Sequence, residues 1–229
     1  MISVIIPTFN EEKALPSTLR HLLEQPGDYE VIVVDGGSAD RTCEVARRVA
    51  ETDLRVRLLS ASKGRASQMN AGAKEARGEW VLFLHADTCL PEGALTRLNA
   101  MEPDPAIQAG GFVHGFSGGD WRLRLVSFLD NFRCRRTRII YGDQALFVRR
   151  KLFESLGGFP EQPILEDVAF CEKLVRVASP VILDEPVLTD SRKFVTMGIW
   201  QSLARVLRII LCVQFRLPVL PRGFFQDVR

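Results

Sequence analysis

The residues of this 229-residue chain that are best placed for chemistry stand directly after an apolar run. The run VLFL, 81–84, is followed at once by His85, Ala86 and Asp87. A strand that is apolar on both faces belongs inside a parallel sheet, and ligands gather beyond the carboxyl ends of such strands. A carboxylate at that edge can hold a hard divalent cation that it shares with a phosphorylated ligand. Aspartates at strand ends also form turns and helix caps, so Asp87 alone does not define a site.

Two further apolar runs end in polar clusters. The first is followed by PTFNE, 7–11, and the second ends in Asp35 and continues as GGSADRT. Helices that begin at the same edge point backbone amides and the positive ends of their dipoles toward it, which favours phosphate groups. We therefore predict that Asp35 accepts hydrogen bonds from a base or ribose, that Arg65 in KGRASQMNAG approaches a diphosphate, and that Asp87 ligates the magnesium or manganese ion that neutralises it.

Elements of one recurring pattern must position these clusters, because apolar runs and helical patterns alternate over the first hundred residues. Strands are expected at 3–9, 30–35, 56–60 and 80–84, and helices at 13–24, after Ser38 and at 66–76. Such alternation with short connections implies parallel strands joined by right-handed crossovers. The predicted fold class is α/β, a three-layer α/β/α sandwich with a mostly parallel central sheet.

The pattern is looser after Pro105. It predicts a strand at 109–116, an arginine-rich helix, a strand at 140–149 with GDQ near its start, and a helix at 165–177 led by Glu166 and Asp167. No stretch reads as a linker between independent domains. We therefore predict a single domain over residues 1–229.

Composition narrows the class of protein. The net charge of +2 gives no reason to expect a nucleic-acid partner. The five cysteines are odd in number and form no CxxC pair, so neither a disulfide framework nor a zinc site is indicated, and a reducing cytosol fits them. The chain enters a strand at its start and holds no run of about 18 uncharged apolar residues, so we expect no signal peptide, no membrane span and a cytoplasmic location.

The order and spacing of several motifs resemble those of family-2 glycosyltransferases of GT-A (Rossmann-like) fold. The motifs are SVIIPTFNEE, VIVVDGGSADRT, GRASQMNAG, FLHADT, GDQALFVRR, GGFPE and ILEDVAFCEKL, and they run from Ser3 to about Leu174. HADT together with GDQALFVRR, ILED and DSRKF is similar to a small single-domain bacterial subgroup. The resemblance implies a nucleotide-sugar-binding half at 1–104, an acceptor and catalytic half at 105–190, and a helical appendage at 191–229.

The same resemblance implies an inverting transfer of a sugar from a UDP- or GDP-type donor, with Mn²⁺ or Mg²⁺ at a DxD-like motif. Asp87 matches the final, metal-binding aspartate of DxD, and Asp167 in LED matches the base that deprotonates the acceptor hydroxyl. Asp35 and Arg65 match residues that contact the nucleotide. Glu166 can orient or tune the base, although an acidic pair at a helix start is also a common cap.

His85 occupies the first DxD position, where the family usually has aspartate. A neutral histidine there can coordinate the metal or hydrogen-bond the ribose, or it can simply pack at the strand end. Contacts to the nucleotide sugar are also expected from Pro7, Thr8, Asn10, Glu11, Gly37, Asn70 and Ala86.

Two further groups match the subgroup. Gly142, Asp143 and Gln144 are expected to face the acceptor or the donor sugar, although a plain turn also uses glycine and aspartate. Arg192 and Lys193 are adjacent basic residues that can clamp the diphosphate, and a solvated basic pair is the alternative.

The stretch Trp200 to Leu217 is apolar but punctuated by Arg205, Arg208 and Arg216. It is too interrupted to span a bilayer. A basic, hydrophobic helix of this kind can lie on a membrane surface, where lipid-linked acceptors occur. Packing on the sheet or a homodimer contact is the alternative.

The motifs fit three other functions less well. A non-catalytic nucleotide-sugar-binding or scaffold protein at the membrane surface would not need a base, so the presence of both Asp87 and the LED motif argues against it. Nucleotidyltransferases generally carry a glycine-rich basic signature near the first strand, which PTFNEEKAL lacks. A nicotinamide dehydrogenase would need GxGxxG after that strand, and it is missing.

Overall fold

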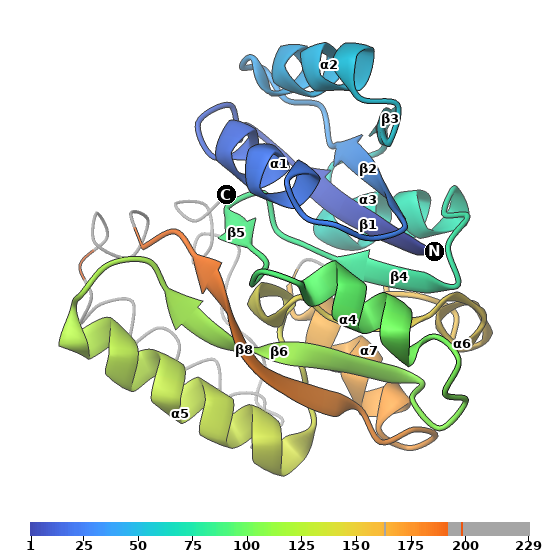
Figure 1. The fold of residues 1–229 in the computed structure, drawn as a ribbon, viewed down its shortest axis with the longest axis vertical. Helices are drawn as coiled ribbons and strands as arrows, with labels where there is room; N and C mark the ends of the chain where they lie inside the picture. Colours follow the sequence, from blue (N-terminus) through green and yellow to red (C-terminus); the bar gives the residue numbers. More distant parts are fainter. Residues whose placement is uncertain (163, 192–197, 199–229) are drawn as a thin grey trace.

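The computed structural model describes residues 1–162, 164–191 and 198, and these form one continuous mixed sheet covered by helices (Figure 1). Within them the strand order is β3-β2-β1-β4-β7-β6-β8-β5. The strands are β1 Ile2–Thr8, β2 Tyr29–Asp35, β3 Val56–Ser60, β4 Trp80–Phe83, β5 Thr88–Cys89, β6 Ala109–Phe116, β7 Phe147–Arg149 and β8 Val181–Thr189. The helices are α1 Leu15–Leu23, α2 Thr42–Thr52, α3 Arg65–Lys74, α4 Ala94–Met101, α5 Trp121–Thr137, α6 Arg150–Ser155 and α7 Glu166–Leu174.

The first half of the sheet is parallel. β1 pairs in parallel with β2 and β4, and β2 pairs in parallel with β3. Every residue of β2 and β4 is buried, as expected for strands covered on both faces. The carboxyl ends of these strands therefore lie at one edge, and the strands and helices predicted for residues 1–84 are confirmed within two residues at most of their boundaries.

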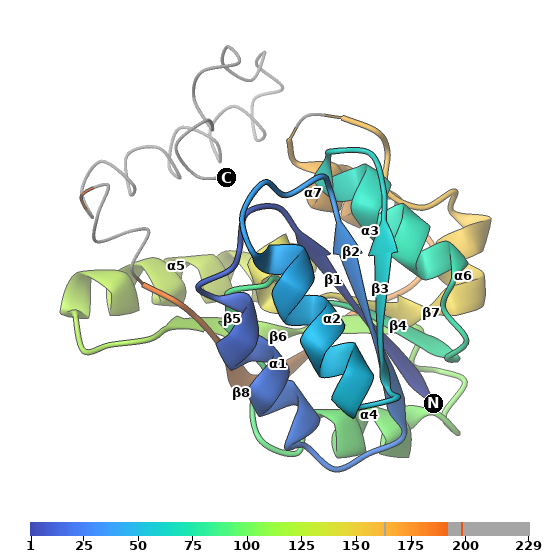
Figure 2. The same ribbon diagram turned by 90° about the horizontal axis from the view of Figure 1, so that it is seen from above.

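Helices cover both faces of the sheet, as Figure 2 shows. α1, α2 and α4 pack on one face around Leu15, Leu19 and Leu95. α3, α6 and α7 pack on the other, where Phe153 and Phe170 contact Phe159. The predicted three-layer α/β/α sandwich is confirmed.

The second half mixes strand directions. β7 is antiparallel to both β4 and β6, β6 is parallel to β8, and β5 is antiparallel to β8. The apolar pattern does not predict β8, because Asp184, Glu185 and Pro186 interrupt it. A register shift opposite Phe112 and Val113 leaves two residues of β8 out of the pairing and so accommodates the proline.

The predicted strand at 140–149 is wrong for most of its length. Only Phe147–Arg149 is a strand, and Gly142–Gln144 forms a single 3₁₀ turn. The side chain of Gln144 accepts a hydrogen bond from the Tyr141 amide at 3.0 Å, and Ala145 has a positive φ of 47°. A turn closed by its own side chain and followed by a left-handed residue cannot continue as a strand. Of the predicted appendage at 191–229, only residues 191 and 198 are described.

Candidate active site

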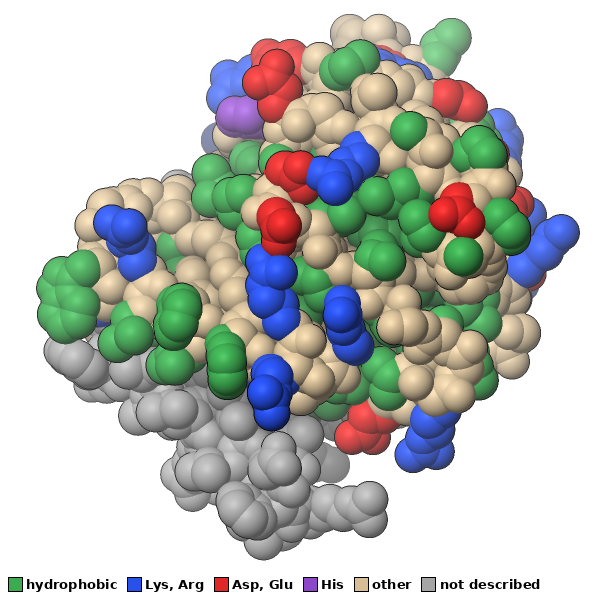
Figure 3. Space-filling view, turned by 60° about the horizontal axis from the view of Figure 1, so that its bottom comes forward, with side chains coloured by type: hydrophobic (Ala, Val, Ile, Leu, Met, Phe, Trp, Pro, Cys, Tyr) green, Lys and Arg blue, Asp and Glu red, His purple; other side chains and the backbone are tan. Residues whose placement is uncertain are grey.

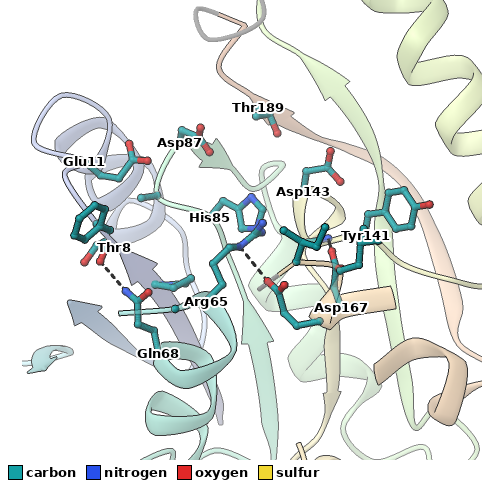
Figure 4. Close-up of a pocket in the computed structure, with 18 of the residues that line it drawn as sticks. Thr8, Glu11, Arg65, Gln68, His85, Asp87, Tyr141, Asp143, Asp167 and Thr189 are labelled. Atoms are coloured by element: carbon teal, nitrogen blue, oxygen red, sulfur yellow. Dashed lines mark hydrogen bonds and ion pairs between the residues drawn. The ribbon is translucent and has the colours of Figure 1, made fainter. Parts of the chain in front are cut away.

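A cleft of about 320 Å³ opens beyond the carboxyl ends of β1 and β4, between them and the start of α7 (Figure 4). It is lined by Pro7, Thr8, Phe9, Glu11, Lys63, Gly64, Arg65, Gln68, His85, Ala86, Asp87, Tyr141, Gly142, Asp143, Ile164, Leu165, Glu166, Asp167, Thr189 and Asp190. Both halves of the sheet contribute to it. We call the side formed by β1, α3 and the loop after β4 the donor wall, and the side formed by residues 141–143 and 164–167 the acceptor wall, after the ligands that the sequence predicts for them.

Arg65 joins the two walls. It is the first residue of α3, and its guanidinium hydrogen-bonds His85 and lies 3.3 Å from Glu166, measured from Nε to Oε1. Glu166 is 2% exposed, so a charge at that depth needs such a partner. Three residues predicted from separate motifs are thus brought into direct contact.

Asp167 is held by backbone amides. Its Oδ2 accepts a hydrogen bond from the Gly142 amide at 2.6 Å, and its Oδ1 accepts one from Val168 at 2.8 Å. Burial raises the pKa of Asp167, the guanidinium of Arg65 opposes this rise, and the neighbouring Glu166 adds to it. A carboxylate with a raised pKa is a stronger base than an exposed one, which is the property that proton abstraction requires.

The acceptor wall depends on two unusual backbone positions. Leu165 precedes α7 with a φ of 60°, a left-handed conformation that costs a non-glycine residue roughly 1–3 kcal/mol. Opposite it, a Cβ at Gly142 would lie 2.6 Å from Arg65 Nη2 and 2.7 Å from His85 Nε2. Glycine therefore lets the 142–144 turn approach the centre of the cleft.

The backbones of Asp87 and Asp190 meet where β5 pairs with β8, and both residues line the cleft. The Asp190 amide donates a hydrogen bond to the Asp87 carbonyl at 3.0 Å, and the neighbouring Thr88 and Thr189 pair across β5 and β8. In the described parts of the chain no three His, Cys, Asp or Glu side chains gather as a complete metal site. An incomplete set of oxygen ligands is what Mg²⁺ or Mn²⁺ uses when phosphates supply the rest, so the residues present fit such an ion.

Comparison with known proteins identifies the family. The sequence model of glycosyl transferase family 2 matches residues 3–160, more than half of the chain. This chain belongs to glycosyl transferase family 2. A mannosyltransferase of Pyrobaculum calidifontis, solved with GDP-Man and Mn²⁺, shares its fold with a TM-score of 0.64 and 27% identity, over 82% of this chain and 56% of that one. The fold is therefore the GT-A fold, as expected.

Two curated relatives are also similar. A Mycobacterium bovis protein named PGL/p-HBAD biosynthesis glycosyltransferase is 34% identical over 171 residues, which cover 69% of this chain and 63% of the relative. A Pseudomonas aeruginosa undecaprenyl-phosphate 4-deoxy-4-formamido-L-arabinose transferase is 30% identical over 167 residues, or 68% and 49% of the two chains. This family-2 chain thus spans less than two thirds of either relative. Within its described residues, no helix is both long and apolar enough to cross a membrane.

Most of the site residues predicted from the sequence line the cleft of this family-2 chain. They are Pro7, Thr8, Glu11, Arg65, His85, Ala86, Asp87, Gly142, Asp143, Glu166 and Asp167. Arg192 and Lys193, as well as the segment Trp200 to Leu217, lie outside the described residues.

Asp35, Gly37 and Asn10 are not among the residues that line the cleft. Asp35 accepts hydrogen bonds from the amides of Gly37 and Ser38, both at 2.9 Å, and from the Ser38 hydroxyl at 2.5 Å. Asn10 likewise accepts from the Ala39 amide at 2.8 Å. Asp35 thus closes the loop after β2, Asn10 fastens that loop to the loop after β1, and Gly37 allows the turn with its φ of 87°.

Asn70 and Gln144 also lie away from the cleft, because their amides bind the backbone. Asn70 donates to the Phe159 carbonyl at 2.8 Å and accepts from the Phe159 amide at 2.9 Å, so it holds the GGFPE loop against α3. Gln144 is fully buried and closes its own turn. The expectation that Gln144 faces a sugar is therefore not met.

Sequence reasoning missed Gln68, Tyr141, Thr189 and Asp190. Gln68 is 3% exposed and donates from Nε2 to the carbonyls of Thr8 and Val34 at 2.6 and 2.8 Å. The sequence could have indicated Gln68, because it follows Arg65 by three residues and therefore lies on the same face of the helix as Arg65. Thr189 and Asp190 reach the cleft through the pairing of β8 with β5, whereas Tyr141 directly precedes the predicted Gly142.

A buried polar cluster supports the acceptor wall from behind. His114 Nε2 lies 3.8 Å from Asp143 Oδ2, and Arg133 stacks on the ring of Tyr141 at 3.5 Å. Burial and the charge of Asp143 raise the pKa of Asp130, which pairs with Arg133 at 2.8 Å. These contacts fix Asp143 and Tyr141 in place at the cleft edge.

Proposed function

We propose that this chain transfers a sugar from a nucleoside-diphosphate sugar of UDP or GDP type to an acceptor hydroxyl, with inversion at the anomeric carbon. The observation that carries the proposal is the meeting of Arg65, Asp87 and Asp167 in one cleft (Figure 4). The donor wall would offer the cation of Arg65 and the carboxylate of Asp87 to a diphosphate and its metal ion, and the acceptor wall would offer Asp167 as a base. A binding protein would need only the first of these.

The donor wall suits the diphosphate. Arg65 at the amino terminus of α3 adds its charge to the positive end of the helix, and Lys63 lines the same side of the cleft. Asp87 would hold Mn²⁺ or Mg²⁺, with Asp190 as the second carboxylate at hand. The ion would stabilise the negative charge that develops on the departing diphosphate.

The acceptor wall suits deprotonation. Asp167 would take the proton of the acceptor hydroxyl as its oxygen forms a bond to the anomeric carbon, while the bond from that carbon to the diphosphate breaks and the electron pair leaves with the diphosphate. The Gly142 amide fixes the carboxylate, and Glu166 fixes Arg65 beside it. Attack from the face opposite the leaving group inverts the anomeric configuration.

The experiment separates binding from turnover. Calorimetry with UDP and GDP, each with and without Mn²⁺, measures nucleotide binding, and product NMR with the matching sugar nucleotide measures transfer and anomeric configuration. We expect metal-dependent binding of one nucleotide by both wild type and Asp167→Asn, and an inverted product from wild type alone. Binding with no turnover on any acceptor tried would favour a non-catalytic nucleotide-sugar-binding protein instead.

A further inference from the structure

Helix α5 has two apolar faces, and only one of them is packed. Leu123, Val126 and Cys134 are buried on the side that faces the body of the protein. On the other side Trp121, Leu125, Phe128, Leu129 and Phe132 are exposed by 64, 42, 65, 45 and 58%. We call these five residues the outer stripe of α5, and the row of apolar side chains at the lower left of Figure 3 belongs to it.

The outer stripe is continuous along the helix. Its residues are separated by four, three, one and three positions, and at about 100° per residue they fall within a sector of roughly 100°. Single exposed apolar residues are common on proteins, but a contiguous aromatic stripe on one helix marks an interaction surface.

Arginines border the outer stripe on both sides. The same helical geometry sets Arg124 and Arg135 along one border, Arg122 along the other, and Arg136 within the sector between Leu125 and Leu129. The one acidic residue of α5, Asp130, lies on the inner side, where it pairs with Arg133. Arg122 pairs with Asp120 at 2.7 Å and Arg135 with Asp184 at 2.5 Å, so the net positive charge beside the outer stripe rests on Arg124 and Arg136.

We propose that the outer stripe of α5 binds the surface of an anionic lipid bilayer. Trp121, Phe128 and Phe132 would enter the boundary between headgroups and acyl chains, and the arginines would contact the lipid phosphates. Arginine stems can lie along apolar surface while the charged head stays in water, which suits this position.

Charge favours a lipid bilayer as the partner of the outer stripe over two protein partners, a second copy of this chain and the chain's own segment Trp200 to Leu217. A second copy of α5 would bring two arginine borders together. The apolar segment Trp200 to Leu217 carries Arg205, Arg208 and Arg216 and no acidic residue, so it too would add like charge. An anionic bilayer neutralises these charges and buries the aromatic rings at the same time.

Other residues of α5, outside the outer stripe, connect the helix to the acceptor wall. Asn131 of α5 exchanges two hydrogen bonds with the backbone of His114 in β6, at 2.7 and 2.9 Å. Arg133 of the same helix stacks on Tyr141, which lines the cleft. Where the proposed function holds, this arrangement favours an acceptor that is itself anchored in the membrane.

Vesicle flotation of the full chain, without any sugar donor, tests the proposal. We expect binding to vesicles of phosphatidylcholine with phosphatidylglycerol, and weaker binding to phosphatidylcholine alone or at high salt. Phe128→Ser with Phe132→Ser should weaken partitioning by roughly tenfold or more. Leu54→Ser is the matched control, because Leu54 is 96% exposed but lies between α2 and β3, outside the stripe, and it should bind like wild type.

Several results would overturn the proposal. They are failure of the wild type to bind anionic vesicles, equal binding by the stripe variant, and conversion of a wild-type dimer to a monomer by the same substitutions. A lower melting temperature of the stripe variant together with unchanged flotation would indicate that the chain itself covers α5. None of these outcomes bears on nucleotide binding or turnover, so the proposed function is judged separately.

Discussion

Asp35 is buried and Asp167 is partly buried, and their environments shift the carboxyl pKa in opposite directions. Burial pushes the pKa of Asp35 upward, but hydrogen bonds from Ser38, Cys43 and Gly37 outweigh it and hold the pKa below its ordinary value. Burial also raises the pKa of Asp167, and there its two amide hydrogen bonds and Arg65 do not outweigh it. The balance between desolvation and hydrogen bonding therefore decides whether such a carboxylate is a stable anion or a base.

The same contrast separates the two walls. On the donor wall, the amide of Gln68 hydrogen-bonds two backbone carbonyls. The nearby carboxylate of Asp35 is stabilised as an anion, because its pKa is lowered. The acceptor wall carries Leu165 in a left-handed conformation and an aspartate with a raised pKa. A left-handed leucine and an aspartate with a raised pKa favour the acceptor wall as the one that performs the chemistry, while the other wall binds.

Removal of the base should give the largest effect. Asp167→Asn is expected to lower kcat by about 10²–10⁴-fold, because general-base catalysis contributes on that scale, while nucleotide affinity changes by no more than about threefold. Steady-state kinetics and calorimetry on the same preparation measure the two effects. Asp143→Asn is the matched control, since Asp143 lines the same wall and should cost far less. Equal loss of binding and turnover in Asp167→Asn would assign it a ligand-binding or structural role.

The acid limb of the pH profile should follow the raised pKa of Asp167. The base acts only when deprotonated, so kcat/KM should fall about tenfold per pH unit below that pKa, starting above the ordinary aspartate value of about 3.9. Glu166 raises the pKa of Asp167, so Glu166→Gln should move the limb to lower pH. A wild-type profile that stays flat down to the ordinary aspartate value would contradict the assignment.

The effect of Mn²⁺ on nucleotide affinity should depend on Asp87 of the donor wall. Asp87→Asn is expected to remove the gain in nucleotide affinity that Mn²⁺ gives, a loss of roughly tenfold, because the protein offers few oxygen ligands beside Asp87. Titration of nucleotide with and without Mn²⁺ measures it. Asp190→Asn should give a smaller loss in the same direction. Metal-strengthened binding that persists in Asp87→Asn would mean that another residue holds the ion.

Sequence predicted residues of both walls, but it did not predict contacts between segments that lie far apart along the chain. Asp87 and Arg65 follow local patterns, an apolar run that stops and a helix that starts, and such patterns are visible in a few neighbouring residues. Asp190 reaches the cleft because β8 pairs with β5 about a hundred residues away, across a strand whose proline hides it. Asn70 was expected to bind a ligand, but its partner is a backbone 89 residues distant, which no local pattern reveals.

Substitution of Gln68 should weaken the donor wall without touching the acceptor wall. Gln68→Met keeps the volume but leaves the carbonyls of Thr8 and Val34 without its two hydrogen bonds, at a cost of about 1–3 kcal/mol in the free energy of unfolding. Urea denaturation measures this. Gln25→Met is the control, since Gln25 makes one long hydrogen bond of 3.4 Å to Leu90 and should cost less. Equal losses in the free energy of unfolding of the two variants would mean that the hydrogen bonds of Gln68 do not specifically stabilise the donor wall.

The smallest effect is expected at Asp35, and it tests the comparison directly. Asp35→Asn replaces an anion that accepts amide and hydroxyl hydrogen bonds, so it should lower the free energy of unfolding by about 1–2 kcal/mol at neutral pH. Because the folded-state pKa of Asp35 is lowered, its stabilisation is fully present above the unfolded-state pKa and is lost as the pH falls through the folded-state pKa. The difference between variant and wild type, followed by urea denaturation across acidic pH, should therefore shrink toward low pH. A constant difference would mean that Asp35 acts through shape alone, and a loss of nucleotide binding with unchanged stability would return it to the ligand role that its motif suggests.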